Sequence, residues 1–129
     1  MFSKILVPVD LDAPEVAAKA MATARRIAAT EGAGILVISV TPDPKDPEKE
    51  AALEARLKAY IDGERGELEM DGILNLGGSV AREVRAVAEE MGVDLVVMAS
   101  HWPRLDDHLF GSRSASVALH SHCSVLVVR

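Results

Sequence analysis

The pair Gly111-Ser112 is the clearest candidate for ligand chemistry in this 129-residue chain. It follows a polar loop that leaves the apolar run at residues 94–99, and it opens a segment with helical spacing at residues 112–120. The start of a helix presents free backbone N–H groups, and glycine lets a ligand approach the backbone closely. Together with the serine hydroxyl, these groups favour phosphate binding. An ordinary N-terminal helix cap is the alternative interpretation.

Other polar residues near this pair are also suited to chemistry. Asp106 and Asp107 lie in the preceding loop. They are either solvated loop residues or ligands of a Mg²⁺ ion that bridges carboxylate and phosphate oxygens. The single tryptophan, Trp102, either stacks on an adenine or packs at an interface. Farther away, Asp10 ends the first apolar run and either binds a ligand or supports the following turn.

The histidines and the single cysteine do not form a recognisable metal site. The chain has His101, His108, His120 and His122, all in its last part. Cys123 gives no standard zinc spacing with them, and it lies in an apolar run where a thiol acts as a small hydrophobe. The sequence also lacks the G-x-x-x-x-G-K-[ST] and G-x-S-x-G motifs, and no G-x-G-x-x-G follows its first strand. We therefore expect no metal centre from these residues.

The composition favours an α/β protein and excludes several partners. Hydrophobic residues make up 49% of the chain and aromatic residues 3%, which suits an aliphatic core between helices and a sheet. The net charge of -6 disfavours nucleic acid and anionic membranes as partners. No apolar segment approaches the roughly 20 residues of a membrane span, and the first apolar run is too short for a signal peptide. We therefore expect a cytoplasmic protein.

Apolar runs and helical spacing predict the elements that position these residues. Buried strands are expected at residues 4–9, 35–40, 94–99 and 123–128, and the stretch 68–76 fits a short strand at an edge. The first helix is expected to begin with a capping box of Asp12 and Glu15 and to end near Thr30, before Gly32. Further helices are expected from about Glu48, from the N-cap Ser79 to Gly92, and at residues 112–120. The proline-rich segment 41–50 is expected to be an exposed loop.

The alternation of strands and helices predicts the fold class. It is typical of an open parallel five-stranded sheet with right-handed crossovers and helices on both faces. Polar loops at the carboxyl edge of such a sheet are where ligands bind. We expect one α/β domain over residues 1–129, although the alternation does not determine the order of the strands.

Four segments of the chain resemble the universal stress protein family: KILVPVD, GGSVAREV, DLVVMASH and FGSRSASVALHSHCSVLVVR. The resemblance covers essentially the whole chain and is most specific in the C-terminal part. It implies a Rossmann-like sheet of strand order 3-2-1-4-5. It also implies a nucleotide site where strands 1 and 4 diverge, because many members of the family bind ATP there. The expected ligand is ATP or AMP, with or without Mg²⁺.

The resemblance implies a set of nucleotide-binding residues. The ends of the first two strands would hold adenine and ribose, and the Gly-Ser helix start with its neighbours would hold the phosphates. The set comprises Pro8, Val9, Asp10 and Val40 for adenine and ribose, and Ala99, Ser100, His101, Gly111, Ser112 and Arg113 around the phosphates.

The chain departs from the family motif, which is G-x-x-G, nine residues and then G-[ST]. Ala99 replaces the first glycine, Trp102 lies near the second, and the connecting loop is one residue shorter. A side chain at either position narrows the space for phosphate groups. Triphosphate binding is therefore less certain than nucleotide binding.

These features lead to one primary hypothesis and two alternatives. The primary hypothesis is a cytoplasmic nucleotide-binding regulatory protein of the stress response. The first alternative is slow Mg²⁺-dependent ATP hydrolysis, for which Arg104 and Arg113 are the only cations we identify and no dedicated base is evident. The second is an interaction module that binds no nucleotide. In all three, the strand that begins at Cys123 and ends at Val128 is expected to be an edge that, by family resemblance, pairs in a homodimer.

Overall fold

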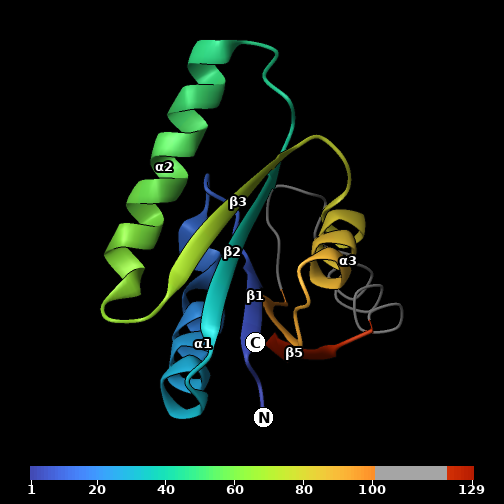
Figure 1. Ribbon diagram of the computed structural model, residues 1–129. Helices are drawn as coiled ribbons and strands as arrows, with labels where there is room; N and C mark the ends of the chain where they lie inside the picture. The colour runs from blue at the N-terminus through green and yellow to red at the C-terminus, as the bar shows by residue number, and fades with distance from the viewer. Residues whose placement is uncertain (101–121) are drawn as a thin grey trace.

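Five parallel strands form the centre of the described part of the molecule (Figure 1). The computed structural model describes residues 1–100 and 122–129. The strands are β1 (Lys4–Pro8), β2 (Gly34–Thr41), β3 (Met70–Leu76), β4 (Leu95–Ala99) and β5 (Ser124–Val128). They lie in the order β3-β2-β1-β4-β5, and each neighbouring pair is parallel. The predicted α/β class, the parallel sheet and the strand order are therefore confirmed.

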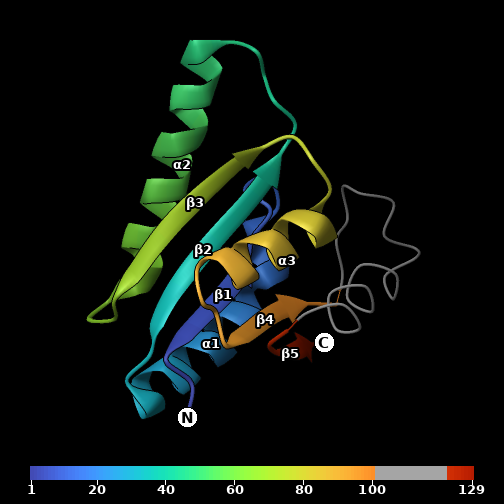
Figure 2. The same ribbon diagram turned by 45° about the vertical axis from the view of Figure 1, so that its right-hand side comes forward.

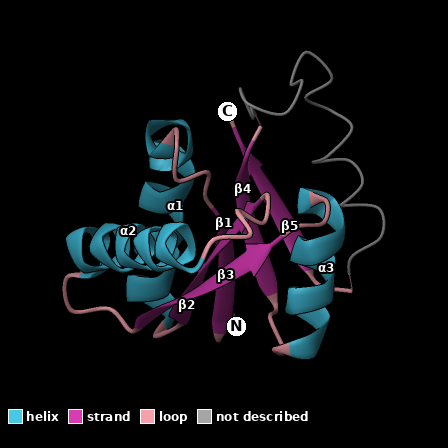
Figure 3. Ribbon diagram, turned by 90° about the horizontal axis from the view of Figure 1, so that it is seen from above, coloured by secondary structure: helices cyan, strands magenta, loops and turns pink. Residues whose placement is uncertain are grey.

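Helices cover both faces of this sheet, as predicted. The elements that join the strands are a 3-10 turn η1 (Pro14–Ala17) and the helices α1 (Ala18–Glu31), α2 (Pro47–Arg65) and α3 (Val80–Glu90). Seen from above, α1 and α2 lie on one side of the sheet and α3 on the other (Figure 3). The predicted helix at residues 112–120 lies outside the described residues.

Two buried clusters join these helices to the sheet, because successive side chains of a strand point to opposite faces. On the α1 and α2 side, Ile5, Val7 and Val97 pack with Met21. The cluster on the α3 side contains Leu6, Ile38, Val96, Met98 and Val84. Burial on both faces explains why β1, β2 and β4 read as continuous apolar runs in the sequence rather than as alternating ones. The burial predicted for the strand at residues 123–128 is wrong, because β5 pairs with β4 alone among the described residues and its side chains are exposed or half-buried.

The capping box expected at the start of the first helix is wrong. That turn is the 3-10 turn η1, and its N-cap residue, Ala13, makes no side-chain cap hydrogen bond. The backbone N–H of Asp12 instead donates to Oδ1 of Asp10 at 2.9 Å. The end of the helix is as predicted, since Gly32 adopts the left-handed conformation (φ 69°) and its N–H donates to the carbonyl of Ala28.

The exposed loop expected at residues 41–50 is shorter than predicted. Thr41 still belongs to β2, and α2 already begins at Pro47. Proline fits the first turn of a helix because its missing N–H has no intrahelical partner there. The side chain of Asp46 caps this start by accepting a hydrogen bond from the N–H of Glu48 at 2.9 Å. The three prolines therefore do not act alike, since the last of them starts a helix.

The third helix and the edge strand agree with the predictions. Ser79 caps α3, with its Oγ accepting a hydrogen bond from the N–H of Arg82 at 3.2 Å. Val80, Val84 and Val87 form its buried face. The strand β3 lies at one edge of the sheet, next to β2. In the described part of the chain, none of the helices is both long and apolar enough to cross a bilayer.

Asp94 fastens the N-terminal ends of β1 and β4 together. Its Oδ2 accepts hydrogen bonds from the N–H of Ser3 at 2.9 Å and from the Ser3 hydroxyl at 3.0 Å. Its Oδ1 accepts a third from the N–H of Lys4 at 3.0 Å. Partial burial disfavours the ionised carboxyl, but these hydrogen bonds outweigh the burial and lower the pKa of Asp94 from 3.8. The ionised side chain therefore stabilises the fold.

Replacing Asp94 with asparagine should lower the free energy of unfolding by about 1–2 kcal/mol at pH 7, because an amide nitrogen cannot accept the Ser3 hydrogen bonds. Since the folded pKa is lowered, the stabilisation is present above the unfolded value and is lost as the pH falls through the folded one. Urea unfolding from pH 7 to pH 3 should thus show the difference between wild type and Asp94→Asn shrinking below about pH 4. The exposed change Asp71→Asn is the control. The prediction would be contradicted if the loss of unfolding free energy in Asp94→Asn were the same at all pH values, or no larger than the loss in Asp71→Asn.

Candidate functional site

The central strands β1 and β4 separate early. They pair at Ile5–Leu95 and Leu6–Val96. Farther along, each strand stays registered with its outer neighbour: β1 pairs with β2 as far as Pro8–Ile38, and β4 pairs with β5 as far as Ala99–Val128. The carboxyl ends of the two central strands are therefore held by different partners, and the sheet opens between them.

The helices that adjoin these strands leave the sheet in opposite directions. The chain passes from β1 to β2 through α1 on one face, and from β3 to β4 through α3 on the other (Figure 2). This reversal makes the β1–β4 boundary a topological switch point, where open α/β sheets bind ligands beyond the carboxyl ends of the strands. The polar residues that follow β1, β2 and β4 all reach this edge.

Asp10 lies at the centre of this edge and organises the backbone after β1. Only 7% of the residue is exposed. Its carboxylate accepts the N–H of Asp12 at 2.9 Å, and its carbonyl accepts the N–H of Ala13 at 3.0 Å. Just before it, the N–H of Val9 donates to the carbonyl of Ile38 at 2.9 Å. Asp10 therefore supports the turn into η1, which is one of its two predicted roles. Its place at the carboxyl edge of the sheet is also compatible with the other predicted role, ligand binding.

Arg56 on α2 holds the same turn from outside. Its Nη2 donates to the carbonyl of Leu11 at 2.6 Å and to Oδ1 of Asp12 at 2.8 Å. The arginine side chain is about half exposed, so solvent screens the ion pair with Asp12. The hydrogen bond to the Leu11 carbonyl contributes more to the position of the loop than the ion pair does, because it joins the loop backbone directly to a side chain of α2. The position of α2 thus determines the position of the turn after β1.

Two adjoining hollows lie beside the ends of β1 and β2. The smaller, of about 10 Å³, is lined by Asp10, Leu11, Asp12, Ser39, Thr41 and Leu53. The larger, of about 350 Å³, is lined by Thr41, Pro42, Pro44, Lys49, Ala52, Leu53 and Arg56. Their shared residues, Thr41 and Leu53, make them neighbours. The larger one falls in the size range of small-molecule sites, and it has two cations on its wall.

Ser39 and Arg56 are the polar residues of this edge that the sequence analysis missed. Ser39 is 1% exposed and lines the smaller hollow with Asp10. A hydroxyl inside the run ILVISV was the available signal, since the other residues of that run are aliphatic. Nothing in the sequence indicates that Arg56 reaches this edge, because an arginine among the charged residues of a helix is common.

Six of the ten predicted nucleotide-binding residues lie in the described part of the chain, at the carboxyl edge of the sheet. Pro8 ends β1 and is followed by Val9 and Asp10, Ala99 ends β4 and is followed by Ser100, and Val40 lies near the end of β2. The N–H of Ser100 donates to the carbonyl of Val128 at 3.1 Å, which holds the start of the following loop against β5. Four predicted residues lie outside the described part of the chain: His101, Gly111, Ser112 and Arg113.

Val40 reaches this edge through its backbone. Its side chain packs against the cluster on the α3 side of the sheet. Backbone groups of a strand point alternately to its two neighbours. Because the carbonyl of Ile38 accepts a bond from β1, and that of Thr41 accepts one from Gly77 after β3, the N–H and C=O of Val40 face β1. They lie beyond Pro8–Ile38, the last registered pair of β1 and β2.

The described residues offer no metal cluster. Among residues 1–100 and 122–129, no three His, Cys, Asp or Glu side chains gather so as to hold an ion. Of the four histidines, His122 lies in the described part, where it is exposed. Burial, and then the nearby Asp94, raise the pKa of the Cys123 thiol above 9.0. The thiol is therefore protonated at neutral pH and packs as an apolar group against the α3-side cluster.

Comparisons with known proteins agree with this geometry. The model of the universal stress protein family matches residues 1–129. Universal stress protein G of Shigella flexneri is 32% identical over 143 residues, covering all of both chains. A universal stress protein in complex with cAMP has a TM-score of 0.76 at 21% identity, covering 99% of this chain and 97% of its own. The universal stress protein from Archaeoglobus fulgidus in complex with dAMP has a TM-score of 0.75 at 18% identity, covering 99% and 98%.

Removing the guanidinium of Arg56 should loosen the turn after β1. In Arg56→Met, the amide hydrogens of Asp12 and Ala13 should exchange faster, and the free energy of unfolding should fall by about 1 kcal/mol, the typical contribution of such a hydrogen bond. Hydrogen exchange followed by NMR measures the first effect and urea unfolding the second. Arg65→Met, which removes the ion pair of Arg65 with Asp62 on the same helix, is the matched control. Equal exchange in both variants would show that Arg56 does not hold the turn.

Proposed function

The chain belongs to the universal stress protein family, and from this premise we propose that it is a regulatory protein that binds an adenine nucleotide at the β1–β4 edge. The observation that best supports the proposal is the early separation of β1 and β4, which pair at Ile5–Leu95 and Leu6–Val96 and then follow different neighbours. The opening lies at the switch point of the sheet, and residues of three strands border it. The nucleotide is ATP in the leading form of this proposal and AMP in the alternative.

The adenosine half would lie over the ends of β1 and β2. The backbone N–H and C=O of Val40 face this space, and they suit the donor and acceptor edge of adenine. The carboxylate of Asp10 suits a ribose hydroxyl, because a buried carboxylate accepts hydrogen bonds from sugar O–H groups. Thr41 lines the 350 Å³ hollow that adjoins this space on the side of α2.

The phosphates would lie toward the end of β4 and the segment that follows it. Ala99 ends that strand and Ser100 follows it, and Gly111-Ser112 would supply the helix start that the sequence predicts. In two related structures, the ligands are cAMP and dAMP, and both contain a single phosphate. Ala99 lies where the family motif has glycine, and its side chain would narrow the space for phosphate groups. For this reason the proposal includes monophosphates beside ATP.

The proposed role is a cytoplasmic switch in the stress response, within one domain of residues 1–129, rather than an enzyme. Binding would bias the segment that follows Ser100, which begins at the β4 edge of the site. Asp106 and Asp107 would join the site only through Mg²⁺ held against the nucleotide phosphates. No base for activating water has been identified in the sequence or in the described residues, so hydrolysis is not part of the proposal.

Calorimetric titration of nucleotide-free protein with ATP and Mg²⁺, and separately with AMP, tests this function. We expect at least one ligand to bind with a micromolar dissociation constant, about -8 kcal/mol. Ser112→Asp places a carboxylate against the phosphates and should weaken that binding roughly tenfold or more. Thr30→Asp, an exposed change on α1, is the matched control. The absence of heat with both ligands, or unchanged affinity in Ser112→Asp, would rule out this site.

A homodimer through β5 is the second part of the proposal. Within the described residues β5 pairs with β4 alone, and it ends the sheet. Leu126 is 37% exposed, which makes the strand an apolar edge. Ser124 donates to Asp94 and Val128 accepts from Ser100, so these residues face β4 and the backbone of Val125 and Val127 faces outward. Antiparallel pairing with a second copy would satisfy those outward groups.

Val127→Pro should separate such a dimer, because proline removes an N–H that points away from β4 and is tolerated at an edge. Leu126→Lys, which places a charge on the apolar edge, should have the same effect without a change of backbone. Sedimentation velocity at micromolar concentration should show dimers of wild type and monomers of both variants. A monomeric wild type would contradict the proposed dimer.

A further inference from the structure

The opposite edge of the sheet, β3, has backbone groups that point away from its neighbour β2. Its odd-numbered residues face β2, since the carbonyl of Glu69 accepts from Ile35 and the N–H of Gly77 donates to Thr41. The N–H and C=O groups of Met70, Gly72 and Leu74 therefore point away from β2. Met70 is buried, whereas Gly72 is exposed and Leu74 half-buried. Within the described residues β3 pairs with β2 alone. Such an edge is a template for another strand.

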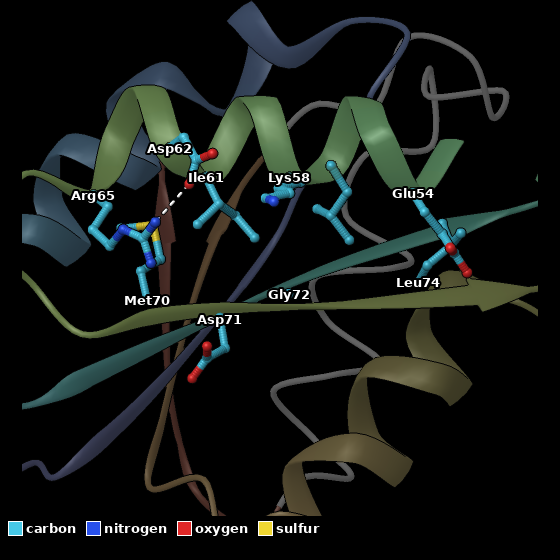
Figure 4. Close-up of a pocket in the computed structure, with 10 residues that line it drawn as sticks. Glu54, Lys58, Ile61, Asp62, Arg65, Met70, Asp71, Gly72 and Leu74 are labelled. Carbon is cyan, nitrogen blue, oxygen red and sulfur yellow. Dashed lines mark hydrogen bonds and ion pairs between the residues drawn. The ribbon is translucent and has the colours of Figure 1, made fainter. Parts of the chain in front are cut away.

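A hollow of about 450 Å³ lies along this edge, between α2 and β3 (Figure 4). The side chains of Leu57, Ile61, Met70 and Leu74 form its apolar floor. Charged side chains of α2 surround it, including Glu54, Lys58, Asp62 and Arg65. The residues whose backbone points outward on β3 also border the hollow. A strand added to β3 would place alternate side chains into it.

Gly72 keeps this edge accessible. A Cβ at this position would lie 2.5 Å from Cδ1 of Ile61 and 3.0 Å from Leu57, so these two side chains of α2 lie directly over the Gly72 backbone and would have to shift for a larger residue. Gly72 is nevertheless exposed at its outer side. Its backbone N–H and C=O are therefore reachable in the middle of the strand, with the hollow on one side of them.

The other side of β3 is acidic. The side chain of Asp71 points away from α2 (Figure 4). Glu69 lies on the same side, since its carboxylate is 3.5 Å from the position of a Cβ on Gly34. Both residues are exposed. A strand paired with β3 would bring every second side chain next to these carboxylates, where opposite charge is favourable and like charge is not.

We infer that β3 binds an extended segment of a partner protein in which apolar residues alternate with lysine or arginine. The backbone of the segment pairs with Gly72 and Leu74. Its apolar side chains enter the hollow beside Leu57 and Ile61, and its cations face Glu69 and Asp71. This is recognition by strand addition, in which the main chain supplies affinity and the alternate pockets supply specificity.

Charge excludes a second copy of this chain as the preferred occupant. Pairing β3 with β3 would add Glu69 and Asp71 of another molecule to an edge that already has the same carboxylates. Each chain also has a net charge of -6. The apolar edge at β5 has no such acidic pair on its strand, so the two edges of the sheet select different partners. A basic strand is the occupant that the charges favour.

The probe for this surface is a short blocked peptide of alternating valine and lysine, titrated into the full chain at roughly 0.15 M salt to limit unspecific attraction. The same peptide with N-methylated backbone keeps its charge and apolar groups but cannot pair with a strand. We expect binding of the first peptide only, with shifts of the amide signals of Gly72 and Leu74 in NMR spectra. Equal binding of both peptides, or no binding of either, would overturn the inference.

Variants of the protein test whether Glu69 and Asp71 contribute to peptide binding. Glu69→Lys with Asp71→Lys should weaken peptide binding roughly tenfold or more, because two favourable cross-strand pairs become unfavourable. Glu89→Lys with Glu90→Lys changes the net charge equally at exposed positions on α3 and should leave the affinity unchanged. Equal effects of the two double variants would overturn the inference. Amide shifts at Gly72 and Leu74 that depend on protein concentration without peptide would also overturn it, in favour of a second copy.

Discussion

Burial of the central strands on both faces is the constraint on which the rest of this structure depends. Ile5 and Val7 face α1 while Leu6 faces α3, so no polar group is accommodated along the middle of β1. Polar chemistry is thereby restricted to the strand ends. At the N-terminal end Asp94 joins β1 to β4, and at the carboxyl end the same strands part. Because β1 and β4 are joined at their N-terminal ends and separate at their carboxyl ends, a ligand can lie between them at the carboxyl edge of the sheet.

The sequence was sufficient for features that depend on local patterns. The buried strands at residues 4–9, 35–40 and 94–99, the Ser79 cap and the Gly32 terminator follow from residue type and spacing, and the structure has them. The strand predicted at residues 123–128 is present, but its side chains are exposed or half-buried because, among the described residues, it lies at the edge of the sheet. The capping box at Asp12 failed because Asp10 and Arg56 compete for the same groups, and Arg56 is distant in sequence. The helix expected from about Glu48 begins at Pro47, but the loop predicted over residues 41–50 extends too far into it, since proline breaks a helix interior yet starts a helix well.

Strand order and the composition of the candidate site needed more than local patterns. Alternation of strands and helices is compatible with several orders, and only the family resemblance implied the observed one. Ser39 and Arg56 reach the edge through long-range packing of β2 and α2, which no spacing rule reports. Glu69 and Asp71 gain a candidate role only from the sheet, which places them along an edge strand.

The helix α2 connects the two surfaces that we propose. Arg56 holds the turn after β1, while its neighbours on the inner face of the helix, Leu57 and Ile61, pack against β3. Ile61 and Leu57 lie directly over the backbone of Gly72, so α2 contacts β3 closely at this point. The position of α2 therefore bears both on the turn beside Asp10, through Arg56, and on the hollow along β3, through Leu57 and Ile61. Their common dependence on α2 follows from close packing, in which one helix contacts both elements.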